Sequence, residues 1–274
     1  MTHAIDLPAY LRRIGYTGEV KPDVATLRAL AAAHVAAIPF ENLDPFLGVP
    51  VVLELPRLER KLIEHGRGGY CFEHNFLFRE VLRTIGYPVT GLIARVLWQR
   101  DESEITAQSH MLLRVEIEGE SWLADVGFGG MVLSGALRLV PGIEQPSAHE
   151  PYRLLEDNGQ WRMQALVRGQ WWTLYRFDLQ PREDIDYVVA NHYTSTFPQS
   201  HFLHQLTIAR SVPGRRLSLR SRDFTVHHLG GESVRRTLGS AEEILEVLER
   251  EFQIQVPRLS HLLARFDALP MPAA

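Results

Sequence analysis

The sequence is short of cysteine, of long apolar runs and of positive charge. A single cysteine, Cys71, among 274 residues excludes an internal disulfide, and chains without disulfides are typical of reducing compartments. No apolar run approaches the roughly 20 residues that a membrane-spanning helix requires. The opening MTHAIDLPAY lacks the basic and apolar regions of a signal peptide. We therefore expect a cytoplasmic protein without a membrane partner.

The charge balance and the histidines exclude two further classes of function. With 29 Lys and Arg against 33 Asp and Glu, the net charge is −4, whereas nucleic-acid-binding domains carry a basic surplus. His201, His204, His227 and His228 have no cysteine or carboxylate nearby at the spacing of a metal site. We expect neither a nucleic-acid partner nor a metal.

The apolar pattern predicts helices first and strands afterwards. The length of 274 residues favours more than one lobe. Apolar residues recur with helical spacing up to about residue 88, and caps or breakers bound each run. The expected helices are 7–14 (capped by Asp6, ended by Gly15), 24–38 (ended by Pro39), 55–63 (ended by Gly66) and 72–85 (ended by Gly86).

From residue 88 to about 180 the pattern alternates at strand length, which predicts an antiparallel sheet or barrel. The segment 192–202, rich in Ser, Thr and Pro, is expected to be a loop. Short strands at 206–210, 216–220 and 224–229 follow. A last helix from Ser240 to Phe252 is indicated by a capping box formed by Ser240 and Glu243.

Cys71 lies where a glycine turn enters a helix, in RGGYCFEHN (67–75). Most lone cysteines are packing residues, so a buried core thiol is one reading. The other is a nucleophile, because the N–H groups at a helix start favour a thiolate. Gly68 and Gly69 would let the backbone turn tightly and let a substrate come close.

A thiolate nucleophile needs a base and a group that orients the base. His110 begins one predicted strand and Asp125 ends the next. A two-residue turn at Glu118–Gly119 would place Leu112 opposite Asp125, with His110 on the adjacent diagonal, within side-chain reach. A turn centred on Gly119 would put His110 on the wrong face. Each residue alone could be an ordinary hydrogen-bonded side chain.

Two further features lie near this constellation. The loop DVGFGG (125–130) could offer backbone N–H groups to a phosphate-bearing donor, although it lacks the GxGxxG and Walker spacings. Glu41 and Arg67 are charges in apolar or glycine-rich surroundings. They are either solvated or, if both are buried, paired.

The motifs together resemble the arylamine N-acetyltransferases, most closely the bacterial arylamine N-acetyltransferase and N-hydroxyarylamine O-acetyltransferase group. The resemblance covers nearly the whole chain. It rests on IPFEN (38–42), RGGYCFEHN (67–75), SH (109–110), DVGFGG (125–130), LYRFDL (174–179) and YTSTFPQSHF (193–202).

The resemblance implies an α+β fold with a cysteine-protease-like core. A helical domain (1–88) would carry the nucleophile, a β-barrel-like domain (89–192) the histidine and aspartate, and an α/β segment (193–274) would form a lid. It also implies assigned residues: the catalytic triad Cys71, His110 and Asp125; the acceptor pocket Phe40, Val96, Phe128 and Phe202; the coenzyme contacts Thr106, Gly129, Gly130 and Tyr193; and the supporting ion pair Glu41 and Arg67.

The implied activity is acetyl transfer from acetyl-CoA, a co-substrate, to an aromatic amine, hydrazine or hydroxylamine. It would proceed by a ping-pong mechanism through an acetyl-cysteine, in xenobiotic metabolism. The chain departs from the common pattern at Ser109, where Thr is frequent, and at Phe197, where Ser is frequent. A cysteine hydrolase and a non-enzymatic binding module remain alternatives. The sequence is compatible with a homo-oligomer but does not fix one.

Overall fold

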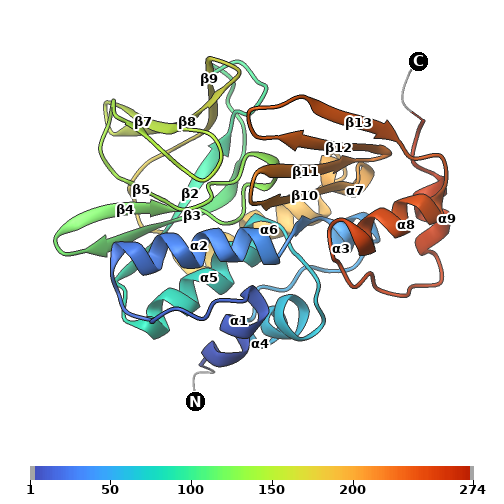
Figure 1. Cartoon of the computed structure of the whole chain (residues 1–274), viewed down its shortest axis with the longest axis horizontal. Coiled ribbons are helices and arrows are strands. Elements are labelled where there is room, and N and C mark those ends of the chain that lie inside the picture. Colours follow the sequence, from blue (N-terminus) through green and yellow to red (C-terminus); the bar gives the residue numbers. More distant parts are fainter. Residues whose placement is uncertain (1–3, 272–274) are drawn as a thin grey trace.

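The computed structural model describes residues 4–271 as an α+β fold (Figure 1). The helices are α1 (Leu7–Ile14), α2 (Val24–Ala37), α3 (Leu43–Phe46), α4 (Leu55–Leu58), the π-helix η1 (Glu59–Glu64), α5 (Cys71–Ile85), the 3-10 turn η2 (Gly129–Met131), α6 (Asp184–Thr196), α7 (His201–His204), α8 (Ala241–Arg250) and α9 (Leu262–Asp267). The strands are β1 (Phe40–Glu41), β2 (Val89–Val96), β3 (Gln108–Ile117), β4 (Glu120–Ala124), β5 (Ala136–Arg138), β6 (Glu144–Gln145), β7 (Tyr152–Asp157), β8 (Gln160–Val167), β9 (Gln170–Phe177), β10 (Thr207–Val212), β11 (Arg215–Arg220), β12 (Asp223–His228) and β13 (Ser233–Thr237).

The predicted helix boundaries are largely confirmed, because local chemistry sets them. The Asp6 side chain accepts the Ala9 N–H at 2.9 Å and caps α1, and Gly15 ends α1 with φ 67°. Helix α5 ends the same way at Gly86, with φ 107°. The predicted helix 55–63 is α4 continued by η1. The predicted last helix is α8, which Ser240 caps.

The middle of the chain forms an eight-stranded antiparallel sheet, nearly closed into a barrel, with the order β5-β4-β3-β2-β9-β8-β7-β6. The hairpin β3–β4 turns at Glu118 and Gly119, whose φ angles are 52° and 81°, as a two-residue hairpin turn requires. Ile117 therefore pairs with Glu120. This confirms the register that the predicted His–Asp contact needs.

A second sheet of five strands combines one early strand of the chain with four late ones. Its order is β1-β10-β11-β12-β13, so the short strand β1, which follows α2, pairs with the late strand β10, with Phe40 opposite Ala209. Helices α8 and α9 cover this sheet at the right of Figure 1. The predicted domain boundary at 192/193 falls inside α6, and the division into three domains remains a prediction.

The predicted loop at 192–202 is wrong. Helix α6 continues to Thr196, and α7 begins at His201. The hydroxyls of Thr194, Ser195 and Thr196 each donate to the carbonyl four residues earlier, at 2.8, 2.8 and 2.5 Å. Hydroxyls satisfied in this way stay compatible with a helix, and Pro198 stands only just beyond its end.

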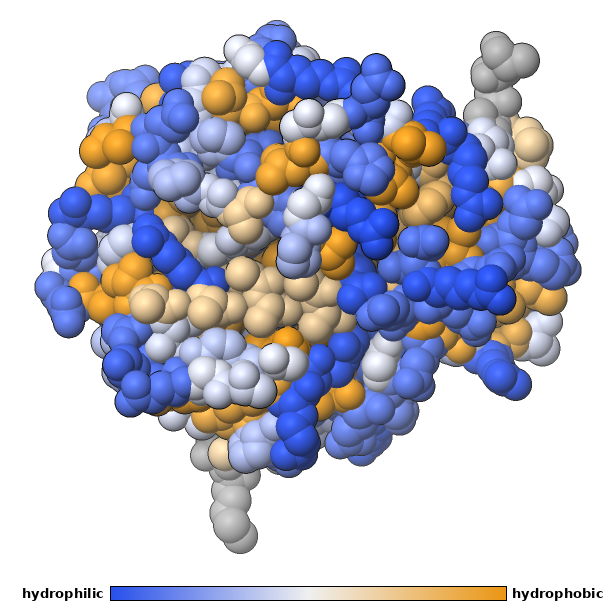
Figure 2. Space-filling model, viewed as in Figure 1, coloured by the Kyte–Doolittle hydropathy of each residue, from blue (hydrophilic) through white to orange (hydrophobic). Residues whose placement is uncertain are grey.

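Apolar cores lie under both sheets, and most of the visible surface is polar. One cluster packs α1, α2 and α5 against β3 and β4, and others fill the barrel and the space between the second sheet and α8. Figure 2 shows the face that carries α2 covered mostly by hydrophilic side chains, with apolar ones scattered between them. Within residues 4–271, no helix has both the length and the apolar character needed to cross a membrane.

Candidate active site

Cys71 is the first residue of α5, and two glycines shape its approach. A Cβ on Gly68 would lie 2.0 Å from the Pro39 carbonyl oxygen, so only glycine fits there. Cys71 is 5% exposed, and its Sγ lies 3.4 Å from the Ser109 carbonyl oxygen. The turn thus brings the thiol against the start of β3.

The structure brings Cys71, His110 and Asp125 together. Asp125 directly follows β4, and its Oδ2 lies 2.7 Å from His110 Nε2. The Cys71 side chain lies close enough to His110 to contribute to the raised pKa of the imidazole. Because Nε2 faces the carboxylate, Nδ1 is the nitrogen left for the thiol. Both the histidine and the aspartate are buried, at 2% and 0% exposure.

The electrostatics of this group favour a protonated imidazole. Burial opposes a charge on His110, but Asp125 and the hydrogen bonds from Asp125 and Cys71 outweigh it and raise the pKa of His110 to about 10. Burial would also raise the pKa of Asp125. The charge of His110 and hydrogen bonds from His110, Asn75 and Gly127 nevertheless hold that pKa below its ordinary value. The arrangement can therefore hold a proton beside the sulfur.

Asn75 is a site residue that the sequence reasoning left without a role. Its Nδ2 donates to Asp125 Oδ1 at 3.0 Å and to the Met111 carbonyl at 2.7 Å. Its Oδ1 accepts the Val126 N–H at 3.1 Å. Asn75 thereby ties the nucleophile's helix to both strands of the hairpin. The available signal was its place four residues after Cys71, on the same face of a predicted helix.

The glycine loop lies against the nucleophile's backbone. The Gly127 N–H donates to Asp125 Oδ1 at 3.0 Å. A Cβ on Gly127 would lie 2.8 Å from Cys71 Cα and 2.9 Å from the Cys71 carbonyl oxygen. Such a close approach of two backbones explains the glycine. Gly129 follows with φ 80°, and Gly130 is exposed with open space around it.

Two aromatic rings enclose the imidazole. The ring centroids of Phe128 and Tyr175 lie 5.1 and 5.0 Å from that of His110. The Tyr175 hydroxyl donates to Met163 Sδ at 2.7 Å, and burial together with the nearby Asp125 carboxylate keeps the pKa of Tyr175 well above its ordinary value. Tyr175 belongs to the motif LYRFDL, but the sequence reasoning gave this residue no role.

The predicted pocket residues form two groups. Phe40 and Phe202 lie 6.2 Å apart by ring centroid, and Phe202 also meets Tyr70 edge-on at 5.7 Å. Val96 pairs with Tyr175 across two strands, and its carbonyl accepts the Thr106 hydroxyl at 3.0 Å.

Tyr193 is 45% exposed on α6 and stacks on Phe197 at 4.8 Å. Its ring contact is thus with a neighbour on its own segment.

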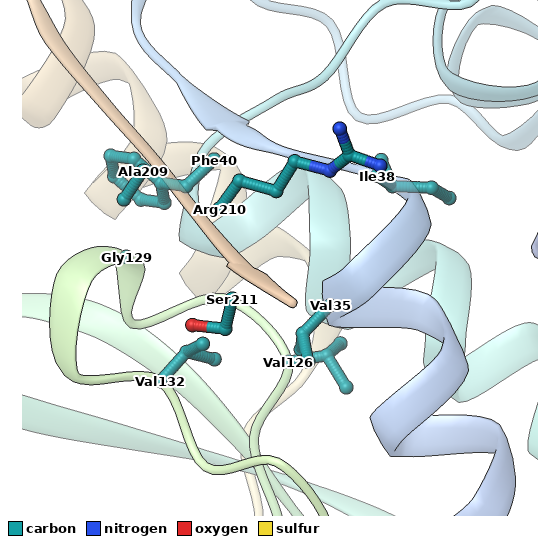
Figure 3. A pocket seen from close by; sticks show the side chains of 9 residues that line it. All are labelled: Val35, Ile38, Phe40, Val126, Gly129, Val132, Ala209, Arg210 and Ser211. Atoms are coloured by element: carbon teal, nitrogen blue, oxygen red, sulfur yellow. The ribbon is translucent and has the colours of Figure 1, made fainter. Parts of the chain in front are cut away.

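A cavity of about 10 Å³ lies beside Phe40 (Figure 3), about the size that holds one water. It is lined by Val35, Ile38, Phe40, Val126, Gly129, Val132, Ala209, Arg210 and Ser211. A larger, open cavity of about 320 Å³ is lined by Arg28, Leu133, Ser134, Gly135, Ala136, Pro146, Ser147 and Ala148. The predicted residues Phe40 and Gly129 line only the smaller one.

A buried network of charges lies close to Cys71 and includes Glu73, on the same helix. Arg67 Nη2 lies 2.7 Å from Glu41 Oε1 and 2.7 Å from Asp44 Oδ1. Lys61 Nζ lies 2.6 Å from Asp44 Oδ2 and 2.7 Å from Glu73 Oε1. Burial outweighs the attraction of Lys61 and raises the pKa of Glu73 to about 7. The sequence singled out only Glu41 and Arg67, because the other partners meet them through the fold.

Within residues 4–271, no group of three or more His, Cys, Asp or Glu side chains is arranged to hold a metal ion. The candidate site therefore consists of the thiol, imidazole and carboxylate, with aromatic rings on one side and the charge network nearby.

Comparisons with known proteins agree on one family. A family model described as N-acetyltransferase matches residues 23–260. The arylamine N-acetyltransferase of Mycolicibacterium smegmatis is 44% identical over 262 residues, covering 94% of each chain. The arylamine N-acetyltransferase / N-hydroxyarylamine O-acetyltransferase of Salmonella typhimurium is 37% identical, covering 96% of this chain and 97% of its own. The solved structure of the Mycobacterium marinum arylamine N-acetyltransferase in complex with CoA superposes with TM-score 0.93 at 39% identity, covering 96% of this chain and 99% of that one.

Proposed function

The chain belongs to the arylamine N-acetyltransferase family, and we propose that it transfers an acetyl group from acetyl-CoA to arylamines, arylhydrazines and N-hydroxyarylamines through an acetyl-cysteine. The observation that carries the proposal is the buried His110, hydrogen-bonded to Asp125 at 2.7 Å and close enough to Cys71 for that side chain to raise the pKa of the imidazole. N- and O-acetylation both follow, since the attacking group is a nitrogen or an oxygen lone pair on the same aryl acceptor.

In the first half-reaction the Cys71 thiolate attacks the carbonyl carbon of the thioester. The bond from carbon to the coenzyme sulfur breaks, and the departing sulfur takes the proton held by His110. Asp125 keeps the imidazole oriented with Nδ1 toward the sulfur. One thioester replaces another, so the exchange is close to balanced in energy and the acetyl-enzyme forms reversibly.

In the second half-reaction the acceptor nitrogen or oxygen attacks the acetyl carbon. His110 takes the proton that the acceptor loses, and the carbon–sulfur bond to Cys71 breaks to restore the thiolate. The rings of Phe128 and Tyr175 cover the imidazole. Apolar rings there favour a flat aryl acceptor and hinder water, which would otherwise hydrolyse the intermediate.

The aromatic group of Phe40 and Phe202 supports a role as a wall of the acceptor site. The late part of the chain is tied to this wall: Asn42 Nδ2 donates to the carbonyls of Phe202 at 2.9 Å and Gln205 at 2.7 Å. We infer that the segment from Tyr193 onward closes over the site as a lid.

The proposed contacts to the acetyl donor, acetyl-CoA, are Thr106, Gly129, Gly130 and Tyr193. Gly130, the second residue of η2, supports this placement, since it is exposed and has open space around it. A free thiol nucleophile is maintained in a reducing compartment, which supports a cytoplasmic location.

Because Cys71 is the only cysteine, one chemical readout tests the proposal. The intact protein incubated with acetyl-CoA alone should gain one acetyl group, lose its reactive thiol, and regain that thiol when an arylamine is added. Cys71→Ala should neither gain the group nor turn over. Turnover of Cys71→Ala near the parent rate would end the covalent scheme.

The same experiment separates this activity from that of a cysteine hydrolase. Acetyl-enzyme formed without an acceptor should persist, and the acetyl group should appear on the amine once it is added. Release of free acetate at the same rate with and without an amine would identify a hydrolase instead.

A further inference from the structure

Three buried side chains form a single chain of hydrogen bonds that ends beside the nucleophile. The hydroxyl oxygen of Tyr10, on α1, lies 2.9 Å from Nδ1 of His34, on α2. His34 Nε2 lies 2.8 Å from His74 Nδ1 of α5, and His74 Nε2 lies 3.2 Å from the Pro39 carbonyl oxygen. All three side chains are at most 1% exposed. None of them takes part in the proposed chemistry.

The end of the chain determines the direction of every bond in it. The Pro39 oxygen can only accept, so His74 Nε2 carries the proton and donates. A neutral imidazole has one N–H, so His74 Nδ1 accepts from His34 Nε2. His34 Nδ1 then accepts, and the Tyr10 hydroxyl donates to it. No other assignment satisfies all four groups while both rings are neutral.

The surroundings keep both rings neutral. Burial lowers the pKa of His74 to about 4 and lowers the pKa of His34 well below its ordinary value. Burial likewise raises the pKa of Tyr10, so its hydroxyl stays protonated. A chain of neutral groups with one fixed direction is a rigid connection between three helices.

The last acceptor of the chain joins two segments of the proposed site. The Gly69 N–H also points at the Pro39 carbonyl oxygen, at 3.4 Å, and the Glu41 N–H donates to the Gly69 carbonyl at 2.7 Å. The residues before Cys71 and the strand that holds Phe40 are therefore linked at two carbonyls, that of Pro39 and that of Gly69, and His74 donates to the first of them. The His74 ring lies parallel to the Phe40 ring, at an angle of 2° and 6.5 Å between centroids.

We propose that His74 is a positioning residue that sets the distance between Cys71 and Phe40, and hence how the aryl acceptor meets the acetyl-cysteine. This inference rests on the proposed function. His74 acts through the Pro39 carbonyl, while His34 and Tyr10 fix its ring orientation and its proton on Nε2. The effect belongs to the acceptor step, because the contacts among Cys71, His110 and Asp125 do not pass through Pro39.

Two substitutions separate the donor from the ring. His74→Phe keeps a flat ring but removes the N–H that holds Pro39. His74→Gln loses the ring but places an amide N–H where Nε2 was. For each variant, the rate of thiol loss with acetyl-CoA measures the first half-reaction. The rate of thiol recovery, as a function of arylamine concentration, measures the second.

In His74→Phe the second-order rate of deacetylation by the amine should fall by about 10- to 100-fold, the size expected for a misplacement near 1 Å. Acetylation should stay within about threefold of the parent, and His74→Gln should recover most of the amine rate. Val81→Ala, a buried change on the same helix, controls for loss of stability and should leave the amine rate unchanged at a comparable loss of Tm.

Three outcomes would overturn the inference. His74→Phe could slow both half-reactions equally, or it could keep the parent rate of deacetylation by the amine. His74→Gln could also fail to recover that rate. If the parent protein itself gains no acetyl group, it is the proposed function that fails. Nitrogen NMR of the parent gives an independent readout: His34 and His74 should both be neutral with the proton on Nε2. A proton on Nδ1 of His74 would overturn the inference as well.

Discussion

Replacing Asn75 by aspartate is expected to remove most of the activity, because it puts a second carboxylate beside Asp125. Asn75 Nδ2 lies 3.0 Å from Asp125 Oδ1 and 2.7 Å from the Met111 carbonyl oxygen. In Asn75→Asp an acceptor oxygen replaces the donor at both contacts, while the size and shape of the side chain are kept.

The magnitude follows from the 3.0 Å separation. Two unit charges at that distance repel by about 5 kcal/mol at an effective dielectric constant of about 20, which corresponds to about 4 pKa units. The two carboxyls therefore share one proton at neutral pH. A shared proton weakens the negative charge that faces His110, so the pKa of His110 falls. With His110 less often protonated, less of Cys71 is held as the thiolate. The rate of acetyl transfer should drop by about 10²-fold or more, within the range that a general base contributes.

Alkylation by iodoacetamide reports the thiolate directly, because Cys71 is the only cysteine. In Asn75→Asp the rate of Cys71 alkylation should fall at neutral pH relative to the parent protein. Asn75→Ala is the control without an added charge: it loses the same two donor contacts, to Asp125 and Met111, and in addition the acceptor of the Val126 N–H. An Asn75→Asp variant that reacts as fast as Asn75→Ala at every pH would refute the charge argument.

Three other predictions follow from the geometry. Gly127→Ala should cost at least about tenfold in activity, because its Cβ would lie 2.8 Å from the Cys71 backbone, whereas Gly239→Ala, which lies outside the proposed site and whose Cβ would meet nothing nearer than 3.8 Å, should match the parent in the same assay. The pKa of His110 is raised to about 10 from 6.5, so protonated His110 stabilises the fold fully below pH 6.5, and this contribution is lost as the pH rises toward 10. The free energy of unfolding, measured in urea from pH 6 to 10, should fall over this range, and His110→Gln should remove most of that pH dependence. Arg67→Ala leaves the buried Glu41 carboxylate without its ion-pair partner, whereas Asp44 keeps Lys61, and it should lower the free energy of unfolding by about 3–5 kcal/mol. Arg250→Ala breaks only an exposed pair and should cost at most about 0.5 kcal/mol; equal losses would contradict the burial argument.

Prediction from the sequence succeeded where a neighbour in the chain supplies the decisive contact. Asp6 caps α1 three residues ahead, and Gly15 ends it. Glu118 and Gly119 set a two-residue turn, and the whole β3–β4 register follows from it. The 192–202 segment misled because Ser and Thr favour loops on average. Here their hydroxyls bond carbonyls within α6.

The sites that the sequence did not reveal depend on contacts between distant segments. In the sequence Asn75 cannot be told from any other polar helix residue. Its role depends on its contacts with Met111 of β3 and with Val126, which follows β4. Lys61 and Asp44 are separated in sequence, yet they share a buried ion pair at 2.6 Å. The link between His74 and Pro39 spans 35 residues.

The sequence by itself determined most of the order of helices and strands, narrowed the β3–β4 hairpin to two registers, one of which aligns His110 with Asp125, and, through its motifs, indicated the family. These depend on local backbone preferences and on side-chain alternation, which act over a few residues. Only the tertiary structure decided that β1 joins the late sheet, that Asn75 holds the Asp125 carboxylate, and that a buried chain of hydrogen bonds runs from Tyr10 to Pro39. Each of these depends on which segments, distant in the sequence, are buried against one another. Short-range sequence patterns do not specify that pairing.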